Sequence, residues 1–160
     1  MVKLFGMISV LTSSVLTGFL MAKDLSERTK ALREIYRSAT HIKTELEYRA
    51  ANICECFRMR GELFSTAHSY IQKKGYLPEE ALKKAAENMG TLNKEDRDVI
   101  FAFAENLNKE DVNCQVANTA LFLESIKARI CDAENEYIMK NRLYKSGGAI
   151  VGIGFIILLL

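Results

Sequence analysis

The sequence predicts an all-α protein: a helical bundle on a long antiparallel helix stem, flanked by apolar membrane segments. Strand-like alternation is absent and good helix formers dominate. Residues 4–22 and 146–160 carry no charge, whereas residues 23–145 hold 21 of the 22 basic and all 20 acidic residues. The predicted organisation is therefore an N-terminal membrane anchor (1–22), a cytoplasmic helical bundle (23–145) and a C-terminal apolar membrane segment (146–160).

The first apolar stretch has the length of a membrane-spanning helix. Nineteen helical residues extend about 28 Å, close to the ~30 Å of a hydrocarbon core. A cleaved signal peptide is the alternative, but Leu20 stands where cleavage after Ala22 requires a small residue. Basic residues follow the anchor, which places the middle of the chain in the cytoplasm. They are Lys23, Arg28, Lys30, Arg33 and Arg37.

The C-terminal apolar stretch is shorter, at about 22 Å of helix. A buried core helix is the alternative, but this stretch has no polar face. Gly148 and Gly152 have the spacing that lets two membrane helices approach closely. Ser9, Ser13 and Thr17 share one face of the N-terminal anchor, and they pack against a second helix or bond to their own backbone. These five residues are the candidate membrane-helix contacts.

The first helix of the middle region is predicted over residues 27–49, with Ser26 as its N-cap. Its apolar positions follow a heptad spacing, which is typical of helix pairing. They are Leu32, Ile35, Ala39, Ile42 and Leu46. Shorter helices are expected between Ala51 and Lys74 and between Pro78 and Gly90, because Gly61, Gly75, Pro78 and Gly90 are natural breakers.

A four-residue sequence then occurs twice, as residues 93–96 and 108–111. Each copy runs from an Asn to an Asp, and the pairs Asn93 with Asp96 and Asn108 with Asp111 are typical of helix starts. The alternative is a duplicated partner-binding loop. One buried helix is expected over residues 94–106 with Val99, Ile100, Phe101 and Phe103 inside. A long one is expected over residues 109–145, with Leu123, Ile126, Ile130, Ala133, Tyr137 and Tyr144 along a heptad seam.

The chain lacks the patterns of catalytic and metal sites. His41 and His68 are the only histidines, and neither has a recognisable catalytic partner by spacing. We therefore expect no enzyme activity, no cofactor and no metal. The four cysteines show no disulfide or metal-binding spacing and are interpreted as reduced structural thiols. The middle region has a net charge of +1, which argues against nucleic-acid binding.

Several motifs together resemble the stage III sporulation protein AB family over nearly the full length. The N-terminal part matches as Lys3-Leu4-Phe5-Gly6, Gly18-Phe19, Arg28 and Leu32-Arg33. The second half matches as Leu92-Asn93-Lys94-Glu95-Asp96, Phe103, Leu107, Asp111 and Gln115. It closes with Asn141-Arg142-Leu143-Tyr144-Lys145-Ser146-Gly147-Gly148 and an aliphatic tail. The chain departs from the family after the first long helix, where no Pro is present, and at Asn108, where Gly is common.

The resemblance implies a non-enzymatic platform or adaptor in the secretion-like channel between mother cell and forespore. Its middle domain would resemble the cytoplasmic domains of the type II secretion platform protein. Expected partners are the sporulation ATPase, stage III sporulation protein AA, and other membrane proteins of the same operon. The expected location is the mother-cell membrane that faces the forespore. The alternative is a membrane-tethered scaffold or coiled-coil tether without an ATPase partner, and the sequence leaves homo-oligomer formation open.

Overall fold

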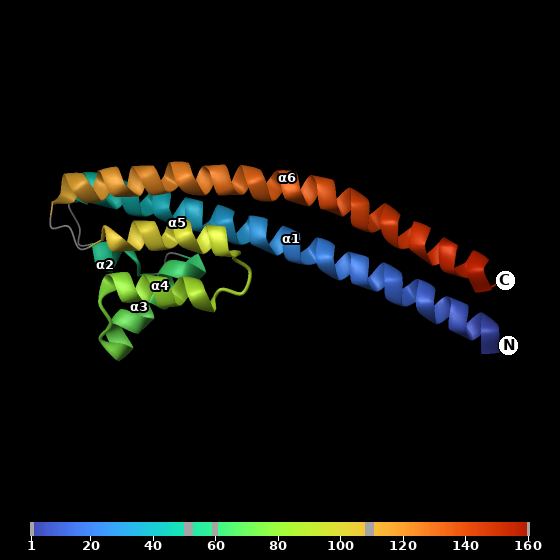
Figure 1. Cartoon of the computed structure of the whole chain (residues 1–160). Coiled ribbons are helices and arrows are strands. Elements are labelled where there is room, and N and C mark those ends of the chain that lie inside the picture. Colours follow the sequence, from blue (N-terminus) through green and yellow to red (C-terminus); the bar gives the residue numbers. More distant parts are fainter. Residues whose placement is uncertain (1, 50–52, 59–60, 108–110, 160) are drawn as a thin grey trace. The chain divides into compact units, whose positions relative to one another are not determined.

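The computed structural model describes the backbone of residues 2–49, 53–58, 61–107 and 111–159, and the side chains of residues 13, 23–49, 53–58, 61–107 and 111–140. These residues form six helices and no strand, which confirms the all-α prediction (Figure 1). The helices are α1 (Val2–Arg49), α2 (Ile53–Cys56), α3 (Gly61–Lys74), α4 (Pro78–Asn88), α5 (Lys94–Glu105) and α6 (Val112–Leu159).

The chain forms two compact units, one from residues 1–29 and 132–160 and the other from residues 30–131. The prediction that a helix starts after Ser26 is wrong, because α1 passes through this residue without a break. No Gly or Pro occurs between Phe19 and Arg60, and a single Ser inside a helix costs little. The predicted start of the last helix at residue 109 lies outside the described residues, and α6 is described from Val112.

No helix among the described side chains has a stretch long and apolar enough to cross a membrane. The two predicted membrane segments, 1–22 and 146–160, lie outside those described side chains, apart from Ser13. Both segments, and the domain boundaries drawn from them, therefore stay predictions.

In the unit formed by residues 1–29 and 132–160, an ion pair joins α1 to α6. Arg28 is 7% exposed, and its Nη1 donates a 2.6 Å hydrogen bond to a Glu136 carboxylate oxygen. Lys140 donates to the other oxygen of Glu136 from one turn further along α6. The pKa of Glu136 lies below its ordinary value, chiefly because Lys140 donates this bond and further because Lys140 and Arg28 are positively charged.

We expect Arg28→Met to destabilise the full chain by about 1.5–3 kcal/mol, the range for a hydrogen bond to a charged group. A Glu whose pKa is lowered on folding stabilises the fold above its unfolded pKa, and this contribution is lost as the pH falls through the folded value. The penalty should therefore be present at pH 7 and shrink as the pH falls below about 4. Unfolding midpoints in detergent across this range check it, and a pH-independent penalty would show that packing of the Arg28 stem dominates.

In the unit formed by residues 30–131, α1 buries the heptad stripe that the sequence predicts. Leu32, Ile35, Ala39, Ile42 and Leu46 are each at most 2% exposed, which confirms the prediction.

The seam predicted on α6 is confirmed only in part. Ile126 and Ala133 are buried, whereas Leu123, Ile130 and Tyr137 are half-buried, and the side chain of Tyr144 lies outside the described set.

The start of α3 is held by a carboxylate from α1. The Glu62 backbone N–H donates a 2.8 Å hydrogen bond to Glu34 Oε1, which satisfies an otherwise unpaired amide at a positive helix end. Gly61, the first residue of α3, has a φ of 66°. A Cβ there would lie 2.7 Å from Ser38 Oγ and 2.8 Å from Glu34 Oε1. Gly61 therefore provides both the left-handed turn and the close approach of α3 to α1.

We expect Gly61→Ala to destabilise the chain more than Gly75→Ala. Both glycines have φ near +66°, so both alanines would be strained by about 1 kcal/mol. Only at Gly61 does the added carbon also displace Glu34 from the α3 start, because Gly75 has open space around its Cβ position. Urea unfolding of both variants measures the difference, and equal losses would show that the Glu34 contact contributes nothing.

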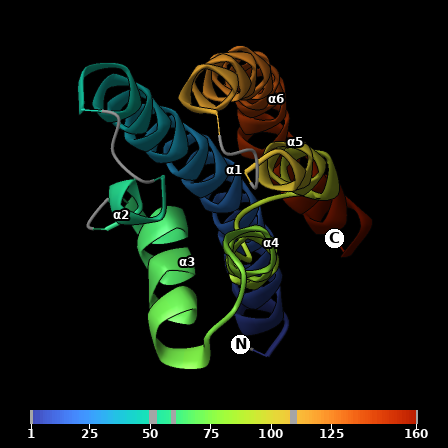
Figure 2. The ribbon, with the colours of Figure 1, turned by 90° about the vertical axis from the view of Figure 1, so that its left-hand side faces the viewer.

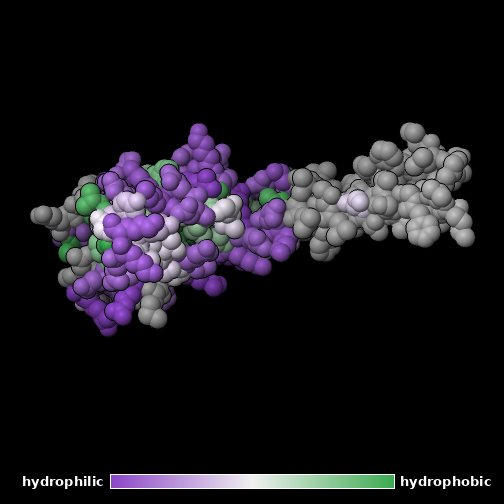
Figure 3. Space-filling view, turned by 90° about the horizontal axis from the view of Figure 1, so that it is seen from below, coloured by the Kyte–Doolittle hydropathy of each residue, from purple (hydrophilic) through white to green (hydrophobic). Residues whose placement is uncertain are grey.

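α4 packs between α3 and α5 through small side chains (Figure 2). Its buried positions are Ala81, Leu82, Ala85 and Ala86, and alanines allow close helix approach. Pro78 occupies its first turn, as the sequence predicts. Lys83 then connects α4 to α5, because its Nζ lies 2.8 Å from Glu79 Oε1 and 3.2 Å from Glu105 Oε1. The face that carries α3 and α4 is mostly hydrophilic (Figure 3).

Candidate protein-binding surface

The N-terminus of α5 is fixed by a reciprocal capping arrangement. The Asp96 backbone N–H donates to Asn93 Oδ1 at 2.8 Å, and the Asn93 backbone N–H donates to Asp96 Oδ2 at 3.2 Å. Asp96 is fully buried, and its other oxygen accepts a 3.0 Å hydrogen bond from Arg129 Nε on α6. The same guanidinium donates to Glu95. One arginine therefore fastens the start of α5 to the middle of α6.

The C-terminal end of α5 is fastened to an earlier part of α6. The rings of Phe103 and Phe122 are stacked, with centroids 4.3 Å apart and an interplanar angle of 16°. Asn118 Nδ2 donates a 3.2 Å hydrogen bond to the carbonyl of Phe103. Because later residues of α5 meet earlier residues of α6, the two helices are antiparallel and joined at two levels.

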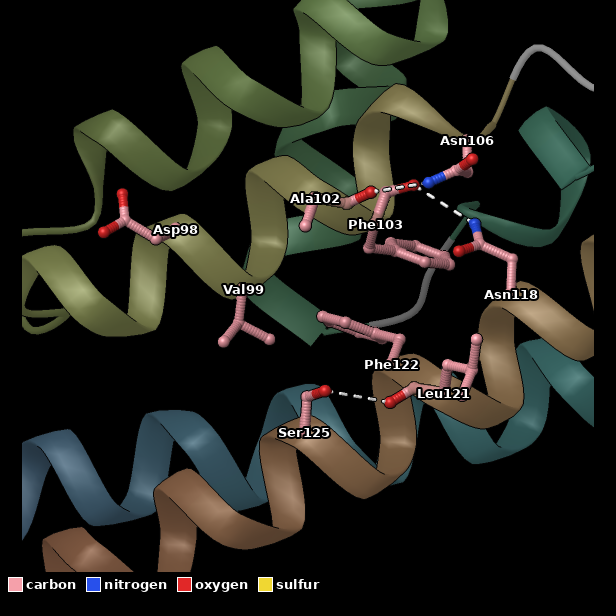
Figure 4. Close-up of a pocket in the computed structure, with 9 residues that line it drawn as sticks. All are labelled: Asp98, Val99, Ala102, Phe103, Asn106, Asn118, Leu121, Phe122 and Ser125. Atoms are coloured by element: carbon pink, nitrogen blue, oxygen red, sulfur yellow. Dashed lines mark hydrogen bonds between the residues drawn. The ribbon is translucent and has the colours of Figure 1, made fainter.

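A groove of about 410 Å³ opens along α5 and α6, and we call it the α5–α6 groove (Figure 4). It exists because Ala102 and Ser125 present short side chains to it. Leu121 stands at its edge with 65% of its side chain exposed, which is high for a leucine. The residues that line the groove are Asp98, Val99, Ala102, Phe103, Asn106, Asn118, Leu121, Phe122 and Ser125.

Each of the three uncharged polar side chains that line the α5–α6 groove donates one hydrogen bond to the backbone. Asn106 Nδ2 donates to the Ala102 carbonyl at 3.1 Å, and Ser125 Oγ donates to the Leu121 carbonyl at 3.0 Å. Asn118 donates to Phe103, as described above. Among the nine described residues that line the groove, Asp98 alone is charged. The surface therefore offers apolar area and one carboxylate, which suits protein contact better than a polar small molecule.

The sequence-predicted site residues occupy different parts of the chain. Asn93 and Asp96 form the α5 cap. Asp111 lies immediately before α6, where its Oδ1 accepts a 3.2 Å hydrogen bond from the Asn113 N–H. Asn108 lies outside the described residues. The candidate membrane contacts Ser9 and Thr17 fall within α1, and Gly148 and Gly152 fall within α6, but their side chains are not described; Ser13 is exposed on α1.

Sequence reasoning missed the residues that shape the α5–α6 groove. Phe122 and Leu121 stand beside Leu123, but the predicted heptad seam includes only Leu123 of the three. Val99 and Phe101 were expected inside, but both are half-buried, and Val99 lines the groove. The sequence feature that indicates these residues is the apolar run at residues 121–123, which is wider than one heptad stripe.

A second cavity, of about 470 Å³, lies between the end of α1 and helices α2 and α3. It has mixed charges, with Glu45, Arg49, Glu55, Arg58 and His68 in its lining. No group of three potential ligands among the described side chains could hold a metal ion. This cavity therefore shows no arrangement that selects one ligand.

None of the four cysteines is in a disulfide, and their thiols lie in different surroundings. Cys56 is buried and Cys54 half-buried, and burial is the main reason that the pKa of the Cys54 thiol is raised. Cys114 and Cys131 are exposed. The interpretation of all four as structural thiols is therefore wrong for the last two.

Three comparisons with known proteins all match this chain to the same family. Residues 3–160 match the family model for Stage III sporulation protein AB. Stage III sporulation protein AB of Bacillus subtilis (strain 168) is 26% identical over 172 residues that cover both chains completely. A solved structure of Stage III sporulation protein AB has a TM-score of 0.60 with 20% identity, over 70% of this chain and 97% of that one, and shows the same fold. The chain therefore belongs to the stage III sporulation protein AB family.

Proposed function

We propose that this protein is a non-enzymatic membrane platform or adaptor of the secretion-like complex between mother cell and forespore. The observation that carries the proposal is the family match over residues 3–160. The α5–α6 groove supports it, because an exposed leucine beside an apolar groove is typical of a protein-contact surface.

In this proposal, residues 1–22 and 146–160 hold the chain in the mother-cell membrane and the middle region faces the cytoplasm. The lack of charge in both ends and the basic residues after residue 22 support this topology. The small residues Ser9, Ser13, Thr17, Gly148 and Gly152 would let the two membrane helices pair. The partners are the sporulation ATPase, stage III sporulation protein AA, and the membrane proteins of the same operon.

The test is affinity purification of the tagged full chain, in mild detergent, from sporulating cells. We expect the ATPase to copurify with it and not with an unrelated tagged membrane protein. We also expect that deletion of the chain removes the ATPase from the membrane fraction and blocks spore formation. A chain that stays in the membrane without retaining the ATPase would instead be a tether and would contradict the coupling role.

A further inference from the structure

We propose that the α5–α6 groove binds an amphipathic helix of a partner protein, which places a lysine or arginine against Asp98. This inference rests on the proposed function, because it names the kind of partner segment that the platform holds. The proposed occupant carries two apolar residues three or four positions apart and a basic residue about seven positions from the first.

The shape of the groove argues for a helix. α5 and α6 are antiparallel and fixed to one another at two levels, so the groove between them is preformed. From Asp98 to Asn106 the groove follows eight residues of α5, or about 12 Å. That length matches two turns of a third helix, whose side-chain ridge packs into the space above Ala102 and Ser125.

The chemistry of the groove argues for apolar side chains in its middle. The exposed Leu121 and Ala102 and the half-buried Val99 provide the apolar contact area. The Phe103 and Phe122 rings are each only 3% exposed and form the floor of the groove. Aliphatic or aromatic side chains at spacing i and i+3 or i+4 would cover this area.

The charge at one end of the groove argues for a basic residue. Asp98 is exposed at the end opposite Asn106 and Asn118 (Figure 4). No ion pair among the described side chains involves it, and Lys94, one turn earlier on α5, makes none with it. The neighbouring carboxylates of Glu95 and Asp96, by contrast, are both taken up by Arg129. Asp98 is therefore the carboxylate that a partner's cation can reach.

The test places a photo-crosslinking phenylalanine at Leu121 of the full chain in sporulating cells, and the crosslinked segment is sequenced by mass spectrometry. The same residue at Tyr48, which is 84% exposed and does not line the groove, is the control position. We expect only the Leu121 position to capture a partner helix with the apolar and basic spacing given above. Capture of a second copy of this chain, of a segment without that spacing, or of no protein would overturn the inference.

A charge exchange then tests the role of Asp98. We expect Asp98→Lys to lower the Leu121 crosslink at least threefold, and substitution of the partner's basic residue by Glu to restore it. Glu124→Lys is the matched control, because Glu124 is also exposed on this unit but does not line the groove. Equal effects of the two variants, or no restoration, would overturn the ionic contact. If the crosslink fails while the ATPase still copurifies, this inference fails and the proposed function stands.

Discussion

Replacing Arg129 by Met should lower the free energy of unfolding by about 3 kcal/mol, the lower end of the range for breaking a buried ion pair. The reason is the position of Asp96, which is fully buried and accepts its hydrogen bond from Arg129 Nε at 3.0 Å. Without the guanidinium, a buried carboxylate loses its compensating charge. Urea unfolding of the full chain in detergent, followed by circular dichroism, measures the loss.

Two further variants separate charge from packing. Lys127→Met changes an exposed lysine two residues away and should stay within about 0.5 kcal/mol of the wild type. Adding Asp96→Asn to Arg129→Met should recover part of the stability, because an amide can keep the Asn93 cap without a buried charge. If Arg129→Met unfolds like Lys127→Met, the ion pair makes no net contribution and the cap alone holds α5.

Replacing Phe64 by Ala should be at least as damaging, at about 3–5 kcal/mol, because it opens a large cavity in the core. Phe64 on α3 and Phe57, just after α2, are both fully buried, and their ring centroids are 5.1 Å apart. The cavity would separate this pair and loosen α2, which is only four residues long and depends on tertiary contacts.

The matched controls for this prediction are Phe64→Leu and Phe101→Ala. The leucine keeps most of the volume and should cost about 1 kcal/mol. Phe101 is only half-buried, so its removal should cost less than removal of Phe64. A loss at Phe101 as large as that at Phe64 would show that residue 101 is more deeply packed than the structure indicates. The measurement is the urea midpoint, with the slope checked for unchanged cooperativity.

Local pattern was enough to predict the helical class, the buried stripe of α1 and the breaks near Gly61, Gly75 and Pro78. These features depend on helical periodicity and on backbone preferences of single residues. The helix start predicted after Ser26 is wrong, because an N-cap residue begins a helix only where the chain before it is not helical. Here α1 is already helical before Ser26.

The α5–α6 groove and the ion pair between Arg129 and Asp96 could not be predicted from local pattern. Arg129 is 33 residues from Asp96, and both stand among many charged residues of a solvated pattern. Phe122 is buried because α5 packs on a side of α6 that lies next to the heptad seam. Only the packing of α5 against α6 distinguishes these residues from their neighbours, and that packing is decided by the tertiary structure rather than by local sequence.

Because the thiols of Cys114 and Cys131 are exposed, labelling of these native cysteines can test on which side of the membrane they lie. A maleimide with a permanent charge does not cross a lipid bilayer, and it reacts with accessible thiolates. Cys56 is buried and Cys54 is partly shielded with a raised pKa, so these two should react slowly in the folded protein. If residues 30–131 face the cytoplasm, as proposed, intact cells should stay unlabelled and opened cells should gain two fast labels per chain, without any engineered cysteine.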